Sequence, residues 1–377
     1  MVDTLETGRI VIVNPDPHRA EALRFVEEMR IGAAEGVGPD VFGNVGTLAV
    51  GANDVIYVGD YIIGDVKAFA SDGEFLRIMV RRGPGPSAIP NSAFPFTLLS
   101  ERLDRLWVGA TPTLLFLDSL GNIGSPRYRV SPNNAWIGRA DTLNRLYRLN
   151  RWPEALDQSA LALRTSIERL ALAHDGAVSV ADSLPLERVE VRMSRVPARQ
   201  GAAGSGVQLQ PLPLRSEIVW DVDPSGDIWL AQTGKYRIHR ITMSGDTIRT
   251  VELTRNPEPL VGRERDSVAE AAVAFAVDDL PAHKPLIRGL RVGRNGWLWV
   301  RLRASNPDED SWDLFDLCGN HLGSATPPVP LDISPWLPAG PSSILGVTRD
   351  AFDVEYVVRL RIERKEEQPV ASVACSL

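Results

Sequence analysis

The sequence predicts an all-β fold, a single six-bladed β-propeller with four antiparallel strands in each blade. Three observations lead to this prediction. One hairpin pattern recurs along the chain, a second hairpin follows each copy, and both ends of the chain hold strands that lack a local partner. Recurrence of one supersecondary unit is the sequence signature of a repeat architecture.

The first hairpin consists of an apolar stretch, a polar turn and a strand with an aromatic residue. Dipeptides such as Ser225-Gly226 and Asn295-Gly296 stand at the turn, where short hairpins favour them. The copies cover residues 50–58, 222–230 and 292–300, with weaker ones at 100–108 and 140–148.

The second hairpin has a turn of small or polar residues and glycine. Its five copies are 68–73, 117–122, 173–176, 242–246 and 316–320. Two hairpins give four strands, which is one blade. Complete blades are therefore predicted at about 42–90, 96–132, 135–200, 215–253 and 286–329.

The chain ends supply the sixth blade. Strands at 344–348 and 354–362 form one hairpin, and strands at 9–13 and 23–31 would provide its partners. A composite blade from 332–365 and 8–32 closes the ring without an open sheet edge, so residues 1–377 form one domain. The alternative is a β-sandwich or two smaller β domains.

Four segments depart from the repeat. Residues 264–277 are rich in alanine and predict a helical insertion between blades four and five. A glycine-containing loop is expected over 195–208, and a loop with one helical turn over 152–169. Residues 366–377 form a tail past the last strand.

The first blade resembles the bacterial six-bladed propellers related to NHL repeats. The matching residues lie in 38–43, 56–58, 66–69, 71–73 and 82–86, and the segment 345–360 is similar to the closing blade of that group. The resemblance implies a periplasmic or extracellular protein whose signal has been removed, because members are usually exported or lipid-anchored. The alternative is a cytoplasmic protein, since the chain shows no secretion signal.

Blade four carries a second likeness. Residues 226–230 and 236–241 look like one repeat of the streptogramin-lyase propellers. Those enzymes use a metal and a histidine, and this sequence shows only one such repeat. Lyase chemistry is therefore not carried over from the resemblance.

Composition limits the partners. The formal net charge of -7 argues against nucleic acid, which requires a basic surface. No apolar run is long enough to span a membrane, so membrane association would need a partner or a removed lipid anchor. Among 41 basic residues nearly all are arginines, which reflects either a GC-rich genome or bidentate capture of anions.

Candidate binding residues are those that fall in loops at the channel mouth, where propellers carry their sites. Arginine beside aromatic residues suits an anionic ligand or a protein partner. The competing interpretation is that the tryptophans brace the blades and the arginines pair with nearby carboxylates. The candidates are Asp60, Tyr61, Trp136, Arg148, Trp152, Gln232, Lys235, Arg303 and Arg349.

No catalytic residue, metal ligand or cofactor is predicted. The five histidines do not share a metal-binding spacing. A channel Ca²⁺ or Mg²⁺ ion held by carbonyls and carboxylates would leave little trace in a sequence, so that question stays open. Cys318 and Cys375 form either one disulfide between blade five and the tail or two free thiols.

The favoured functional hypothesis is a non-catalytic binding or scaffold propeller. It would engage a protein partner or a small anionic ligand through the channel-mouth loops, and one role open to it is that of an accessory subunit of a larger complex. The alternative is a metal-dependent propeller hydrolase or lyase, lactonase-like or streptogramin-lyase-like.

Overall fold

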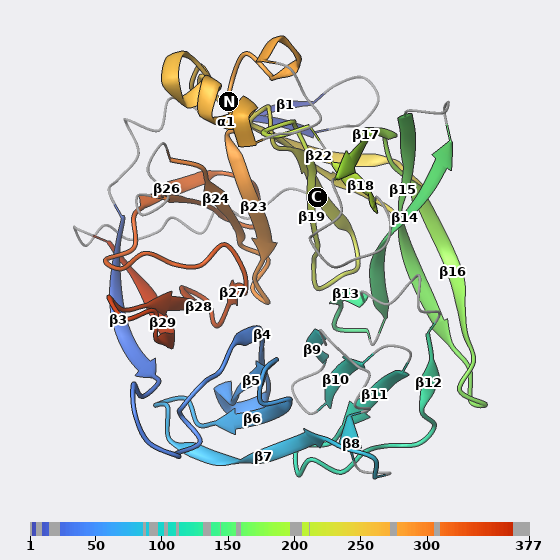
Figure 1. Ribbon diagram of the computed structural model, residues 1–377, viewed down its shortest axis with the longest axis vertical. Helices are drawn as coiled ribbons and strands as arrows, with labels where there is room; N and C mark the ends of the chain where they lie inside the picture. Colours follow the sequence, from blue (N-terminus) through green and yellow to red (C-terminus); the bar gives the residue numbers. More distant parts are fainter. Residues whose placement is uncertain are drawn as a thin grey trace.

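The computed structural model confirms the six-bladed β-propeller, with six small sheets set around a common centre (Figure 1). It describes residues 2–4, 10–14, 23–85, 88–89, 97–101, 105–110, 113–130, 137–143, 145–155, 160–196, 206–210, 212–271, 277–304 and 310–364.

Each blade begins at the centre and proceeds outward. The innermost strands are β4 (Val45–Val50), β9 (Thr97–Glu101), β13 (Ile137–Ala140), β19 (Ile218–Val222), β23 (Ile287–Val292) and β27 (Trp336–Pro338). The second strands are β5 (Ile56–Asp60), β10 (Arg105–Ala110), β14 (Leu146–Ala155), β20 (Ile228–Gln232), β24 (Leu298–Leu302) and β28 (Ser343–Arg349). The third strands are β6 (Asp65–Phe69), β11 (Thr113–Leu117), β15 (Ala160–Leu172), β21 (Arg237–Ile241), β25 (Trp312–Phe315) and β29 (Glu355–Arg364).

The fourth strands are β7 (Phe75–Arg82), β12 (Tyr128–Arg129), β16 (Val178–Pro185), β22 (Thr247–Leu253), β26 (His321–Ala325) and β3 (Leu23–Ile31). Five further strands extend three blades. They are β8 (Ala88–Ile89) on blade one, β17 (Val189–Val196) and β18 (Gly206–Gln210) on blade three, and β1 (Val2–Thr4) and β2 (Ile10–Asn14) on blade four.

The recurring turns follow from one local interaction. The Asp118 carboxylate accepts hydrogen bonds from the backbone of Leu120 at 2.9 Å and of Asn122 at 2.8 Å. Asp316 repeats this pattern in blade five, where Gly319 adopts a φ of +87°. An aspartate that binds its own backbone, followed by a residue free to take a positive φ, fixes a tight turn. This is why the repeat is legible in the sequence.

The ring closes through the N-terminal strand β3, which pairs antiparallel with β29 from Leu23–Arg364 to Ile31–Val357. The other N-terminal strand, β2, does not join blade six. It pairs in parallel with β22 at the outer edge of blade four. There Asn14 donates to the Gly319 carbonyl of blade five at 3.0 Å. Blade six thus combines one N-terminal strand with three C-terminal ones, not two with two.

The helical insertion is present as α1 (Gly262–Ala271), followed by the short helix η4 (Val277–Asp279). The loop expected over 152–169 is wrong, because β14 and β15 occupy this region as two long paired strands. The loop expected over 195–208 begins within β17 and ends within β18, and its middle lies outside the described residues. The tail 366–377 also lies outside them.

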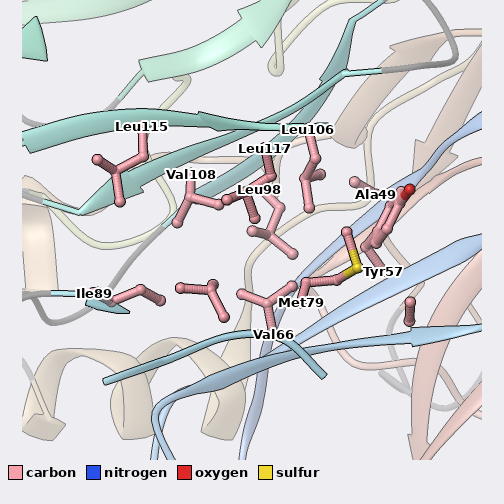
Figure 2. Packing of buried hydrophobic residues seen from close by; sticks show 12 residues of the cluster. Ala49, Tyr57, Val66, Met79, Ile89, Leu98, Leu106, Val108, Leu115 and Leu117 are labelled. Atoms are coloured by element: carbon pink, nitrogen blue, oxygen red, sulfur yellow. The ribbon is translucent and has the colours of Figure 1, made fainter. Parts of the chain in front are cut away.

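The apolar core consists of six clusters, and each one lies between two neighbouring blades. Figure 2 shows the cluster between blades one and two, where Tyr57, Val66 and Met79 meet Leu98 and Leu106. The clusters leave the middle of the ring to other side chains. Among the described residues, no helix is long and apolar enough to cross a membrane.

Candidate functional site

A cavity of about 410 Å³ lies at the centre of the ring and is lined from all six innermost strands. We call it the central cavity. Figure 1 shows the six strands β4, β9, β13, β19, β23 and β27 around this point. Its volume falls in the range of small-molecule sites.

Charged side chains enter the central cavity from three consecutive blades. Arg139, Asp221 and Arg291 hold the same position in β13, β19 and β23, one residue before the end of each strand. Across the hairpin each faces an aromatic residue of the second strand, and these are Tyr147, Trp229 and Trp299.

Arg139 and Asp221 form an ion pair that joins blade three to blade four. The second carboxylate oxygen of Asp221 accepts a hydrogen bond from the Val292 backbone of blade five at 2.7 Å. The Arg139 guanidinium also lies 5.3 Å from the ring centroid of Trp220. Asp221 is only 5% exposed, so both of its oxygens are committed to holding neighbouring blades.

Arg291 is in a different position. Its guanidinium donates to the Leu290 carbonyl at 3.2 Å and lies 5.4 Å from the ring centroid of Trp336. Among the described residues, no carboxylate comes within 4.0 Å of it. Burial, together with the nearby charge of Arg139, lowers the pKa of Arg291 to about 9, and the charge of Asp221 only partly opposes this. Arg291 is therefore a cation at the centre of the ring that has no carboxylate partner among the described residues.

The rest of the central cavity is lined by uncharged residues of blades one, two and six. Thr47, Tyr61 and Ser334 are polar among them, and Leu98 and Leu337 are apolar. The cavity thus combines cationic groups from blades three and five with an uncharged wall of mixed polarity. Such a lining favours a small molecule with an anionic group.

Two further side chains border the central cavity. The ring of Tyr61 packs so closely over Gly46 that a β-carbon there would come within 2.1 Å of it. Burial raises the pKa of Tyr61 to about 12, so its hydroxyl stays protonated. Arg294, in the first turn of blade five, donates to the carbonyls of Val50 and Gly51 in blade one.

Of the residues predicted from the sequence, Tyr61 lines the central cavity and Trp152 lines a second cavity beside blade three. The fully buried Asp60 carboxylate instead orders a loop, accepting from the backbones of Gly43 at 2.7 Å and Ile63 at 2.9 Å. Arg148 is buried in an ion pair with Glu168.

Gln232 donates to Glu187 at 2.6 Å, and Lys235 is exposed beside it. Arg303 directly follows β24 of blade five and is half-buried, and burial and the charge of Arg288 lower its pKa. Although partial burial opposes it, contacts with Asp353, Glu355 and Asp332 raise the pKa of Arg349. The structure does not bring these residues together, and their ligand-binding role stays a prediction.

Trp136 and Cys375 lie outside the described residues. Cys318 is nearly buried in the outer turn of blade five, where its backbone donates to Asp316 at 2.8 Å. The disulfide between the two cysteines therefore stays a prediction. The described residues contain no group of three or more His, Cys, Asp or Glu side chains that could hold a metal ion.

The sequence reasoning missed Arg139, Asp221 and Arg291. Each is a lone charge between apolar residues of an innermost strand, as in Trp220-Asp221-Val222. Both faces of such a strand pack against neighbouring blades, where a charge is costly unless it is paired. A charge that recurs at one repeat position in three successive blades was the available signal.

No protein-family model matches this chain, and the curated proteins contain no match. Solved structures with a similar fold do exist. A putative exported protein from Bacteroides fragilis is 10% identical with a TM-score of 0.49, covering 94% of this chain and 100% of that one. A streptogramin B lyase is 10% identical with a TM-score of 0.45, covering 90% and 98%. A putative gluconolactonase is 14% identical with a TM-score of 0.39, covering 93% and 96%.

At these identities the likeness shows the fold alone. The expectation of a non-catalytic scaffold is contradicted by the similar structures, which include a lyase and a putative gluconolactonase. The resemblance to NHL-repeat propellers is confirmed only at the level of the six-bladed fold.

Proposed function

We propose that this protein is a hydrolase or lyase that acts on a small organic anion in the central cavity. The observation that carries the proposal is Arg291, which lines the central cavity partly buried and has no described carboxylate within 4.0 Å; burial and the charge of Arg139 lower its pKa to about 9. Strongly perturbed pKa values in a cleft concentrate at functional sites.

The energetic argument concerns what would neutralise this charge. An unpaired cation inside a ring of packed blades is unfavourable, and a bound anion would offset that penalty. Arg139 stands beside Arg291 but is held by Asp221, so its position is fixed before a ligand enters. The three guanidinium groups that line the cavity, those of Arg139, Arg291 and Arg294, and the one carboxylate leave a net charge of +2, which suits an anion.

Both reaction classes develop negative charge on an oxygen, either during attack on an ester or lactone carbonyl or during proton removal next to a carbonyl. Positioned donors in a dry site stabilise such an oxyanion strongly. Arg291 would supply the charged donor, and Tyr61, whose hydroxyl stays protonated, lines the same cavity.

The metal-dependent form of this hypothesis has no support from the described side chains, which lack a cluster of metal-binding donors. The proposal therefore rests on guanidinium groups. The extracytoplasmic location remains a prediction from the sequence resemblance, to be checked by fractionation of cells that express the full gene.

The test is a turnover assay with small carboxylated lactones, esters and elimination substrates. We expect the wild type to convert at least one of them and Arg291→Met to lose that activity at least 100-fold. Arg237→Gln, which removes an exposed arginine paired with Glu252 on blade four, should be unaffected. Equal turnover by wild type and Arg291→Met, or no binding of any carboxylate to the wild type, would rule the proposal out.

A further inference from the structure

Blade three carries an extension that the ring does not need. Its strands β14 and β15 contain 10 and 13 residues, whereas β20 and β21 of blade four contain 5 each. The surplus length continues the hairpin past the blade, where Trp152 faces Arg164 across the strands.

A bulge interrupts the neighbouring strand at this point. β15 pairs with β16 as far as Ser166–Pro185 and with β17 from Leu163–Val189 onward. Residues 186–188 thus stand opposite only two residues of β15, which is the geometry of a β-bulge. Gln232 of blade four donates to Glu187 at 2.6 Å and ties the bulge to the next blade.

A cavity of about 420 Å³ lies at the bulge, and we call it the bulge cavity. Its lining includes the Trp152 ring, 45% exposed, and the hydroxyl groups of Ser166 and Ser183. Arg164 and Arg188 stand at the same cavity. Packing alone does not explain an exposed tryptophan beside a cavity that also carries hydroxyl and guanidinium groups.

The charged side chains at the bulge cavity differ in how closely they are paired with groups of opposite charge. Glu168 at the base is neutralised, since Arg148 contacts it at 2.8 Å and Asn150 donates to it at 2.6 Å. Among the described residues, the one ionic partner of Arg188 is Glu154 at 3.6 Å, and both side chains are well exposed. Arg164 has no hydrogen-bonding or ionic partner among the described residues. The open rim is therefore cationic, next to an aromatic face and two hydroxyls.

We propose that the bulge cavity binds an acidic saccharide, in which a uronate ring stacks on Trp152 and its carboxylate pairs with Arg164 and Arg188. A sugar ring offers an apolar face to the indole, and a guanidinium matches a carboxylate with two parallel hydrogen bonds. Ser166 and Ser183 favour a sugar over an aromatic acid, because they can bond ring hydroxyls that an aromatic acid lacks.

Titration calorimetry with trigalacturonate, maltotriose and benzoate tests this site in the full chain. Trigalacturonate should bind at least 10-fold more tightly than either of the others. Trp152→Ala should weaken trigalacturonate binding at least 10-fold, and Arg164→Gln at least 5-fold. Phe352→Ala removes another exposed aromatic residue, 87% exposed, from blade six, and this variant should bind as the wild type does.

Arg291→Met separates this site from the central cavity. It should leave trigalacturonate binding unchanged even if it abolishes turnover. The proposal is overturned if trigalacturonate does not bind, if benzoate binds as tightly, if Trp152→Ala and Phe352→Ala behave alike, or if Arg291→Met removes the binding. Thermal melting of each variant confirms that a lost signal is not a lost fold.

Discussion

The central cavity and the bulge cavity are nearly equal in volume, about 410 and 420 Å³, yet the ion pairing and burial of their arginines differ. In the central cavity the only carboxylate lining it, among the described residues, pairs with Arg139, and Arg291 is left without a carboxylate partner. At the bulge cavity the lining residue Glu168 pairs with the buried Arg148, whereas Arg164 and Arg188, which have no close ionic partner among the described residues, are exposed at the rim.

The difference shows that the burial of an arginine, not the residue type alone, sets its pKa and the strength of its ionic contacts. Partial burial among six converging strands, together with the charge of Arg139, lowers the pKa of Arg291 to about 9. An open sheet surface leaves Arg188 in water, where its contact with Glu154 contributes little. An arginine thus has a lowered pKa in the central cavity and is a solvent-exposed charge at the bulge cavity.

Removal of a buried carboxylate should produce the largest contrast. Asp221→Ala leaves Arg139 and Arg291 facing each other and removes the acceptor of the Val292 backbone. We expect a loss of about 4–5 kcal/mol in the free energy of unfolding, against about 3 kcal/mol for Glu168→Ala, which leaves one arginine unpaired. Urea unfolding measures both.

Asp221→Ala combined with Arg291→Met supplies the internal control, because removing the second cation should recover part of the loss. Equal destabilisation by Asp221→Ala and Glu168→Ala, with no recovery in the double variant, would mean that the two cavities do not differ as described.

The second contrast concerns pH. The pKa of Arg291 is about 9 in the folded protein, below the ordinary arginine value that the unfolded chain has. Above pH 9 the unfolded state therefore binds more protons at this residue, so its contribution makes the protein more stable as pH rises. Relative to Arg291→Met, the wild type should gain about 1 kcal/mol between pH 8 and 10.

At pH 7 the neutral replacement should itself stabilise the protein by about 1–2 kcal/mol, because it removes a buried and unpaired charge. Urea unfolding of both proteins at pH 7, 8 and 10 provides the readout. A destabilised Arg291→Met with a pH dependence matching that of the wild type would show that the cation is an ordinary structural one.

The smallest effect is expected at the bulge cavity. Trp152 is 45% exposed, so Trp152→Ala should change the free energy of unfolding by no more than about 0.5 kcal/mol. Thermal melting checks this directly. A loss above about 2 kcal/mol would instead make the tryptophan part of the core and remove the reason to assign it a ligand.

How far the sequence could predict this molecule follows from how local each interaction is. The Asp316–Gly319 turn is written in four consecutive residues, so the hairpins and the blade count were predictable. The strand that pairs with β2 was not predictable, because an apolar strand of five residues fits the edge of blade four as well as that of blade six. The alanine and leucine residues of β15 favour a helix locally, and only pairing with β14 overrides that preference.

The site was less predictable than the fold. Asp60 and Tyr61 are adjacent, yet one orders a loop and the other lines the central cavity. The character of Arg291 depends on five other blades that enclose it, and no short sequence segment encodes that enclosure. Loop position was therefore a weaker guide to function than repeat position.

The pairing of β3 with β29 also has a consequence for how the protein is made. During synthesis β3 is among the first strands to leave the ribosome, whereas β29 is the last strand of the ring. β3 therefore stays unpaired until blades one to five and the rest of blade six have been translated. Until then its backbone groups and Phe25, which is buried in the folded protein, are exposed. Strand pairings between distant segments form slowly, and unpaired edges invite wrong partners. A protein that shields this strand while the ring is incomplete should raise the yield of folded molecules.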